Sequence, residues 1–238
     1  MRAERPRGRR LGLAAAAQIF AALVRARERA YASGRLGVAR LPRPVLSVGT
    51  LTTGGSGKTP TVIALGRALA QRGLRCDVLT RGYRRAARAL AIAQTGEEAV
   101  EVVGDEPRLI AARLQAPVLV HPDRFRSGLE AERRFASQLH LLDDGFQHRQ
   151  LARNFDLVLV AARDLEDRML PAGRLREPPA ALARAQAILW VAEDGELDRA
   201  RALLAPFTAA PVFLARRQAL PLLRPPARPF AFCGLARP

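Results

Sequence analysis

A short glycine-rich segment, residues 52–60, has the residue types and spacing of a loop that binds nucleotide phosphates. Glycines let the backbone curl so that successive N–H groups point at phosphate oxygens, and the helix that follows adds partial positive charge. Lys58 would reach the β- and γ-phosphates of ATP, and the Thr59 hydroxyl would bind Mg²⁺. Thr52 stands where the motif G-x-x-x-x-G-K-[ST] has its first glycine. The expected phosphate-binding residues are Thr52, Thr53, Gly54, Gly55, Ser56, Gly57, Lys58, Thr59 and Pro60.

Two pairs of neighbouring carboxylates are candidate partners of a bound nucleotide. Asp143 and Asp144 follow the apolar residues 139–142, and a magnesium-binding aspartate is typical of the carboxyl end of such a strand. An Asp-Gly pair is also common in surface turns. Asp105 and Glu106 precede an expected helix, where they could simply cap it. Asp105 is nevertheless a candidate for the base that accepts the proton of an attacking hydroxyl.

Short apolar strands alternate with helical patterns along the chain, which predicts an α/β fold. We expect a P-loop NTPase-like three-layer sandwich, with a mostly parallel sheet between two layers of helices. Residues 45–48 read as the strand before the glycine-rich loop, and a helix from Thr59 to about Arg72 follows it. Further strands are expected at 76–79, 118–120, 139–142, 157–160 and 188–191, and further helices at about 106–114, 124–136 and 178–185.

The chain of 238 residues carries a formal net charge of +17. Lys58 is the only lysine among its 39 basic residues, and a compact ammonium group suits a tight loop that an arginine fork does not fit. A basic surface favours anionic partners such as nucleic acid, acidic lipid or phosphorylated substrates. Nucleic acid is not expected, because no platform combines aromatic and basic residues. Cys76 and Cys233 form no metal-binding pattern and are typical of a reducing compartment.

The N-terminal region has an apolar stretch, residues 11–24, with arginines on both sides. It is shorter than the roughly 20 residues that span a bilayer. Read as a helix, it places Leu13, Ala17, Phe20 and Val24 on one face. This pattern favours a helix lying in a membrane interface, and the alternative is an ordinary helix packed on the domain.

We therefore divide the chain into three parts. Residues 1–33 form the membrane-associated helix, and residues 34–217 form the P-loop kinase core. Several prolines mark a linker, and 230–234 read as the start of a new strand. Residues 218–238 are thus expected to be a linker and the first strand of an incomplete second α/β domain.

Several strings of residues resemble those of the tetraacyldisaccharide 4′-kinase family, the lipid A 4′-kinases. Their order and spacing agree from about residue 10 onward. The strings are Val48-Gly49-Thr50-Leu51-Thr52, Gly54-Gly55-Ser56-Gly57-Lys58-Thr59-Pro60, Arg81-Gly82-Tyr83, Gly104-Asp105-Glu106-Pro107, Asp123-Arg124, Leu142-Asp143-Asp144-Gly145-Phe146-Gln147-His148 and Leu170-Pro171-Ala172-Gly173-Arg174-Leu175-Arg176-Glu177-Pro178.

The resemblance implies a transferase that moves the ATP γ-phosphate to the 4′-hydroxyl of a tetraacylated glucosamine disaccharide 1-phosphate, forming lipid IVA in lipid A biosynthesis. It implies a peripheral or monotopic protein, expected as a monomer, at the cytoplasmic face of the bacterial inner membrane, whose anionic lipid surface the N-terminal helix binds. By likeness, Asp105 is the catalytic base, acting with Lys58. Arg124 and Arg176 are functional arginines at phosphates. The metal or active-site residues are Thr59, Glu106, Asp143, Asp144 and Glu177.

The chain departs from the family pattern in two ways. Thr50 stands where the family often has asparagine. The family also continues for roughly another hundred residues, with a histidine there that assists the base, whereas the histidines here are His121, His140 and His148. Three alternatives stay open: another P-loop ATPase or GTPase, a truncated and catalytically impaired membrane-binding family member, and a nucleic-acid binder.

Overall fold

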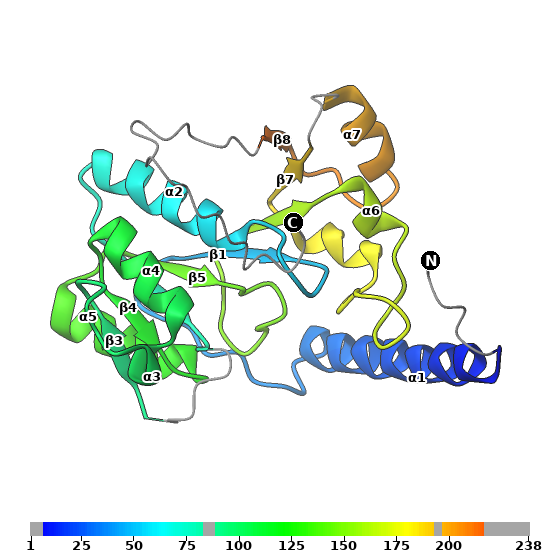
Figure 1. Ribbon diagram of the computed structural model, residues 1–238, viewed down its shortest axis with the longest axis horizontal. Helices are drawn as coiled ribbons and strands as arrows, with labels where there is room; N and C mark the ends of the chain where they lie inside the picture. Colours follow the sequence, from blue (N-terminus) through cyan, green and yellow to red (C-terminus); the bar gives the residue numbers. More distant parts are fainter. Residues whose placement is uncertain (1–6, 83–88, 193–196, 217–238) are drawn as a thin grey trace, which may run out of the picture.

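An eight-stranded sheet, in the order β3-β4-β2-β5-β1-β6-β7-β8, runs through the described part of the computed structural model (Figure 1). The structure describes residues 7–82, 89–192 and 197–216. The strands are β1 (Val45–Thr50), β2 (Cys76–Thr80), β3 (Ala91–Ala93), β4 (Val118–Val120), β5 (Leu139–Asp143), β6 (Phe155–Val160), β7 (Ala187–Val191) and β8 (Val212–Ala215). The helices are α1 (Arg7–Ala32), α2 (Lys58–Gln71), α3 (Val100–Val103), α4 (Asp105–Leu114), α5 (Arg124–Phe135), α6 (Ala162–Leu165), α7 (Leu197–Leu204) and the 3₁₀ helix η1 (Pro179–Arg184).

The sheet is parallel except at one edge, where β3 pairs antiparallel with β4. Alternate residues of its strands face opposite layers, because side chains in a strand alternate between the two faces. Val78 and Leu141 lie in the apolar cluster that includes residues of α2 and α4, whereas Leu79 and Leu142 lie in the cluster that includes Ala131 of α5. The predicted three-layer α/β fold with a mostly parallel sheet is therefore confirmed.

β1 lies near the middle of the sheet, between β5 and β6. The strands are parallel, so the loops that follow β1 and β5 emerge at the same edge. Leu46 to Val48 pair with Leu141 to Asp143, which places the end of β5 beside the start of the glycine-rich loop. This pairing brings the loop and the Asp143-Asp144 pair together.

Some elements differ from those predicted. Residues 178–185 contain the 3₁₀ helix η1 rather than an α-helix. β3, β8 and α7 were not expected. β3 and β8 are short strands at the two edges of the sheet and carry too few residues for a periodic pattern. The expected strand at 230–234 lies outside the described residues.

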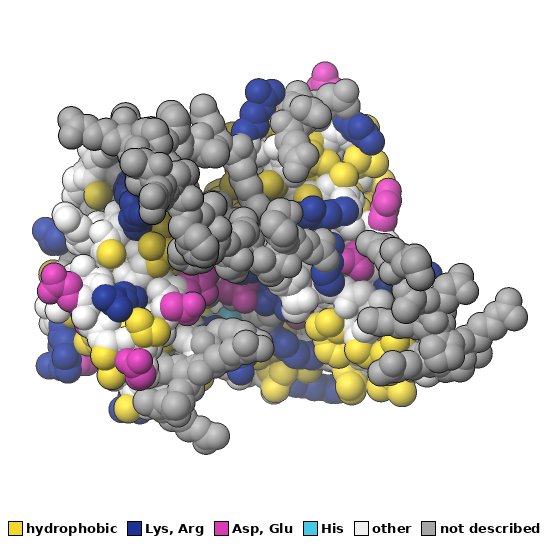
Figure 2. Space-filling model, in the orientation of Figure 1, with side chains coloured by type: hydrophobic (Ala, Val, Ile, Leu, Met, Phe, Trp, Pro, Cys, Tyr) yellow, Lys and Arg dark blue, Asp and Glu magenta, His cyan; other side chains and the backbone are white. Residues whose placement is uncertain are grey.

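The long helix α1 lies along one side of the domain, below η1 in the view of Figure 1. Ala17 and Ala21 are buried, so the apolar face predicted for the membrane is turned largely toward the protein. The large apolar side chains that α1 exposes are instead Ile19 and Leu23, each 64% accessible. Figure 2 shows hydrophobic side chains gathered over this helix. Among the described helices, α1 included, none is long and apolar enough to cross a bilayer.

A buried histidine, His140, links β2 and β5 to α5 at the end of the sheet away from the glycine-rich loop. His140 of β5 bonds through Nδ1 to Asp77 Oδ2 (2.8 Å) and through Nε2 to Glu132 Oε1 (3.0 Å). Burial by itself lowers the pKa of His140, but the contacts with Asp77 and then with Glu132 outweigh it and raise the pKa. These two contacts of His140 link β2, β5 and α5, and the raised pKa favours the protonated imidazole that both carboxylates can accept from.

We expect this group to make stability depend on pH above the ordinary histidine range, about 6.5. Because its pKa is raised in the folded state, its contribution is fully present below that range and is lost as pH rises through the folded pKa. The free energy of unfolding of the wild type, measured in urea at several pH values, should fall as pH rises from the ordinary histidine pKa through the higher pKa of the folded state. His140→Gln should lose this component, whereas the control His121→Gln should keep it; equal pH profiles for both variants would contradict the assignment.

Candidate active site

The glycine-rich loop leads from β1 into the N-terminus of α2. Gly54 and Gly57 have φ angles of 105° and 92°, a region that side chains disfavour, so glycine is required for this path. Gly57 is the N-cap of α2, and no side chain among the described residues caps it. The N–H groups at the start of α2 are therefore available to an anion, as in other phosphate sites at helix N-termini.

The loop is held in place by the segment that contains Arg174 and Arg176. Thr53 N donates to Arg174 O (2.9 Å), and Arg176 N donates to Leu51 O (2.7 Å). The Arg174 side chain is fixed in turn by Asp167, at 2.7 Å. This short antiparallel pairing gives the first half of the loop a defined path before the glycines begin.

Thr52, at the position where the motif has glycine, is buried in this pairing. Its N–H donates to Thr50 Oγ1 (3.3 Å), and the residue bridges to Leu175 on the neighbouring segment. A side chain is tolerated here because residue 52 lies before the positive-φ turn at Gly54.

Two cations share the carboxylate of Asp144. Arg176 donates to both of its oxygens, at 2.7 and 2.8 Å, and Lys58 Nζ lies 3.6 Å from Oδ1. Lys58 also donates to Ser56 Oγ at 3.3 Å. Burial alone would raise the pKa of Asp144, but Arg176 and then Lys58 lower it, so this carboxylate is ionised. Lys58 thus lies between the glycine-rich loop and the carboxylate that follows β5.

Asp143 has the opposite electrostatic environment. It is 3% exposed, and Thr80 Oγ1 donates to its Oδ2 at 3.3 Å. Burial, followed by the charges of Glu106 and Asp144, raises its pKa to about 7. Its Oδ1 atom is buried and has no hydrogen-bond partner in the part of the chain that the structure describes. A cation beside Oδ1 would give this oxygen a partner and would offset the repulsion from Glu106 and Asp144.

The residues present fit a magnesium ion bound together with a nucleotide. Thr59 Oγ1 donates to Glu106 Oε1, so a hydroxyl and a carboxylate already meet at the N-termini of α2 and α4. Among the described residues, no three His, Cys, Asp or Glu side chains form a complete metal cluster. Magnesium at a phosphate loop needs no such cluster, because phosphate and water oxygens supply most of its ligands. Thr59, Asp143 and Glu106 would supply the oxygen atoms from the protein.

Asp105 is exposed at the first residue of α4. Its Oδ1 accepts the N–H of Glu106 at 2.9 Å, a bond within the first helical turn. The Thr59–Glu106 contact brings this turn beside the start of α2. Acidic side chains gather near the middle of the face shown in Figure 2. The position suits a base that must reach a substrate hydroxyl from solvent.

Arg124 is buried at the start of α5, where Nη1 donates to Pro122 O at 2.7 Å. Burial and then Arg81 lower its pKa to about 10, while Asp144 and Asp143 oppose this shift. Its Nε is a buried donor with no partner among the described residues. Arg124 and Arg81 therefore form a positive group near the acidic pair, suited to a phosphate.

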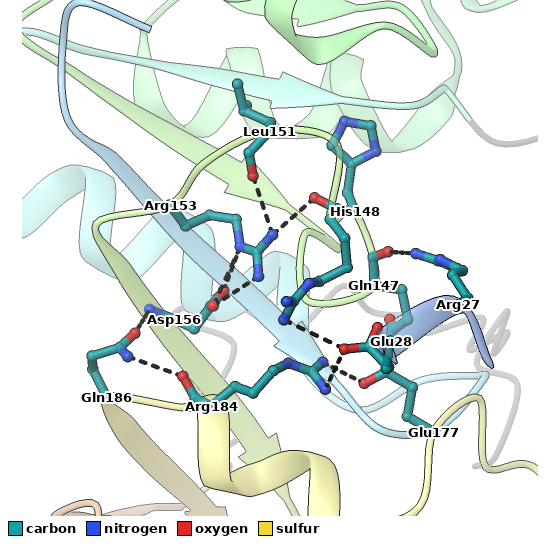
Figure 3. A network of polar contacts seen from close by, with 11 residues as sticks. Arg27, Glu28, Gln147, His148, Leu151, Arg153, Asp156, Glu177, Arg184 and Gln186 are labelled. Atoms are coloured by element: carbon teal, nitrogen blue, oxygen red, sulfur yellow. Dashed lines mark hydrogen bonds and ion pairs between the residues drawn. The ribbon is translucent and has the colours of Figure 1, made fainter. Parts of the chain in front are cut away.

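Glu177 is the candidate that the structure places elsewhere. Its buried carboxylate accepts from Arg184 Nη2 at 2.6 Å, and Arg184 also pairs with Glu28 of α1 at 3.2 Å (Figure 3). These contacts lie on the α1 side of the chain rather than at Thr59. No role for Glu28 or Arg184 was predicted from the sequence, because they meet only through a contact between elements far apart in the chain.

Comparison with known proteins decides the family. A protein-family model described as tetraacyldisaccharide-1-P 4′-kinase matches residues 9–238. The chain belongs to the tetraacyldisaccharide-1-phosphate 4′-kinase family. A tetraacyldisaccharide 4′-kinase of Koribacter versatilis is 43% identical over 228 residues, which cover 92% of this chain and 69% of that protein.

Other members of the tetraacyldisaccharide-1-phosphate 4′-kinase family are also similar to this chain. That of Aquifex aeolicus is 39% identical over 182 residues, covering 75% of this chain and 57% of the relative. A crystal structure of Aquifex aeolicus LpxK in complex with ATP has a TM-score of 0.77 and 36% identity, covering 86% of this chain and 64% of that one. The chain thus spans 57% to 69% of the length of these relatives. The predicted family and its P-loop kinase fold are confirmed.

The environment of Asp143 predicts that its charge lowers the stability of the free protein but is needed to bind the cation. Asp143→Asn removes a buried charge that Glu106 and Asp144 repel, so without Mg²⁺ it should stabilise the fold by roughly 1 kcal/mol. The same change should remove most of the stabilisation that Mg²⁺ with ATP gives the wild type. Thermal unfolding with and without Mg·ATP measures both effects.

The exposed Asp198 provides the matched control, and Asp198→Asn should leave both melting temperatures unchanged. If Asp143→Asn kept the full Mg·ATP-dependent rise in melting temperature, Asp143 would have no part in the metal site.

Proposed function

We propose that this protein transfers the γ-phosphate of ATP to the 4′-hydroxyl of tetraacyldisaccharide 1-phosphate. The observation that carries the proposal is the arrangement of Lys58 and Thr59 at the N-terminus of α2, opposite the carboxylates of Asp143 and Asp144. Membership in the tetraacyldisaccharide-1-phosphate 4′-kinase family supports the substrate.

In this proposal the backbone N–H groups at the start of α2 and the Lys58 ammonium bind the β- and γ-phosphates. A bound Mg²⁺ would neutralise phosphate charge, held by Thr59 and Asp143. Asp105 accepts the proton of the 4′-hydroxyl as its oxygen bonds to the γ-phosphorus, and the bond from that phosphorus to the ADP oxygen breaks. Arg124 and Arg81 offset the charge on the phosphate groups.

Arg176 has a different part, which its contacts define. It donates to the carboxylate of Asp144 and to the carbonyl of Thr50, so it orders the backbone at the start of the glycine-rich loop. Glu177 is assigned to holding Arg184 rather than to binding the metal.

Lys58→Ala should abolish ATP-dependent phosphorylation of the lipid disaccharide, because it removes the ammonium group at the transferred phosphate. Lys58→Arg should also lose most activity, since the fork does not fit between the loop and Asp144. Arg72→Ala, at the far end of α2, is the control and should retain wild-type activity. Transfer of radiolabelled γ-phosphate to the purified lipid measures all three, and activity in Lys58→Ala would remove the loop from the mechanism.

We further propose that α1 rests on an anionic membrane surface. Ile19 and Leu23 present apolar side chains to solvent, and Arg25 and Arg29 lie on exposed positions of the same helix. Apolar insertion and attraction to acidic headgroups act together in such helices. The cytoplasmic face of the inner membrane is the location that fits a substrate carrying acyl chains and a reaction that uses ATP.

The double variant Ile19→Asp with Leu23→Asp should weaken association with phosphatidylglycerol vesicles about tenfold or more, because two apolar anchors become charged. Val102→Asp with Leu109→Asp changes two other exposed apolar side chains, on α3 and α4, and should leave association unchanged. Co-sedimentation measures the difference, and equal association of both variants would place the membrane contact away from α1.

A further inference from the structure

Polar contacts join α1 to the two segments that hold the candidate active site (Figure 3). Glu28 Oε2 lies 3.2 Å from Arg184 Nη1, and Arg184 Nη2 lies 2.6 Å from Glu177 Oε2. One arginine therefore bridges a carboxylate of α1 and a buried carboxylate beside Arg176. Since Glu177 is almost fully buried, its charge depends on this partner.

A second set of contacts starts one residue earlier on α1. Arg27 Nη2 donates to Gln147 O, and Gln147 Nε2 donates to Thr50 O at 3.0 Å. Thr50 O also accepts from Arg176 Nη2 at 3.2 Å. The second set therefore ends on the carbonyl that Arg176 also contacts, at the end of β1, while the first set ends on Glu177, the chain neighbour of Arg176.

Arg184 also packs against the side chain of Phe146. Its guanidinium lies 4.6 Å from the centroid of the fully buried Phe146 ring. Phe146 packs against Gly49 so closely that a Cβ at residue 49 would lie 2.4 Å from the Phe146 Cβ. A displacement of Arg184 is therefore transmitted to β1, because the close packing leaves no space to absorb it.

The effect of such a displacement on Lys58 follows from the contacts that Arg176 and Lys58 both make with Asp144. Arg176 makes two short bonds to Asp144, and Lys58 makes one longer contact. If Arg176 leaves Asp144, the carboxylate loses its two short bonds and interacts more strongly with Lys58, with Arg124 as the other cation nearby. Lys58 is then less available to phosphate.

We propose that Glu28 is a positioning residue, which acts through Arg184 and Glu177 to keep Arg176 on Asp144 and so leave Lys58 available for nucleotide. The inference rests on the proposed function for the identity of the nucleotide, ATP. It assigns α1 a part in ordering the phosphate site that is separate from any contact with lipid.

The test is a double-mutant cycle on the affinity of the full chain for Mg·ATP, measured by calorimetry. Glu28→Gln removes the charge at a partly exposed position and should weaken Mg·ATP binding about threefold to tenfold. Arg184→Lys keeps a charge beside Glu177, so the buried carboxylate stays paired, but a single ammonium cannot bridge both carboxylates. It should weaken binding by a similar factor, and the two variants together should lose no more than either alone.

Glu101→Gln, an exposed glutamate of α3, is the matched control and should bind as the wild type does. Thermal unfolding of each variant separates a loss of affinity from a loss of folded protein. Wild-type affinity in Glu28→Gln, or independent and additive losses in the cycle, would overturn the inference and leave the proposed function standing.

Failure of the proposed function has a different signature. A wild-type chain that binds Mg·ATP with the coupled losses above but transfers no phosphate to the lipid disaccharide would support the inference and contradict the proposed function. A wild-type chain that binds no Mg·ATP would contradict both.

Discussion

The candidate active site depends on how one carboxylate, that of Asp144, is divided between two cations. Arg176 makes the shorter contacts and Lys58 the longer one. If Lys58 were the main partner of this partly exposed carboxylate, its ammonium would bind the carboxylate more strongly and be less free to bind a phosphate. Because Arg176 neutralises Asp144, Lys58 keeps its charge close to the loop and free to bind phosphate.

Much of the surrounding structure can be understood as support for this arrangement. The segment around Arg176 pairs with the start of the loop, so the same residues fix the path of the backbone and the position of the guanidinium. Asp143, the neighbour of Asp144, is buried with an unpaired oxygen and a raised pKa. The free chain therefore holds a buried carboxyl oxygen without a partner among the described residues, at the place where a phosphate-bound cation would pair with it.

The sequence predicted the parts of the site that are local in the chain. The loop, the strand before it and the helix after it follow from glycines, apolar residues and one lysine within a short stretch. Asp143 and Asp144 were predictable because an apolar strand precedes them. β3 and β8 were missed since short edge strands lack a periodic pattern, and the buried face of α1 was taken for a membrane surface because helical periodicity does not say what covers an apolar stripe.

Long-range contacts could not be predicted in the same way. Nothing in the residue types around Glu28 and Arg184 indicates that they meet, and Glu177 looked like a metal ligand because it follows Arg176 in a string resembling the family. The fold resolves this ambiguity by turning adjacent side chains in opposite directions, as Arg176 bonds to Asp144 and Glu177 bonds to Arg184. The roles of the site residues remain proposals that rest on this geometry.

A crystal structure of the chain with Mg²⁺ and a non-hydrolysable ATP analogue would test the central claim most directly. Lys58 Nζ should then lie on the β- and γ-phosphate oxygens, while Arg176 keeps both of its bonds to Asp144. A nucleotide bound away from residues 54–59, or a Lys58 that stays on Asp144 while Arg176 moves to the phosphates, would contradict the account.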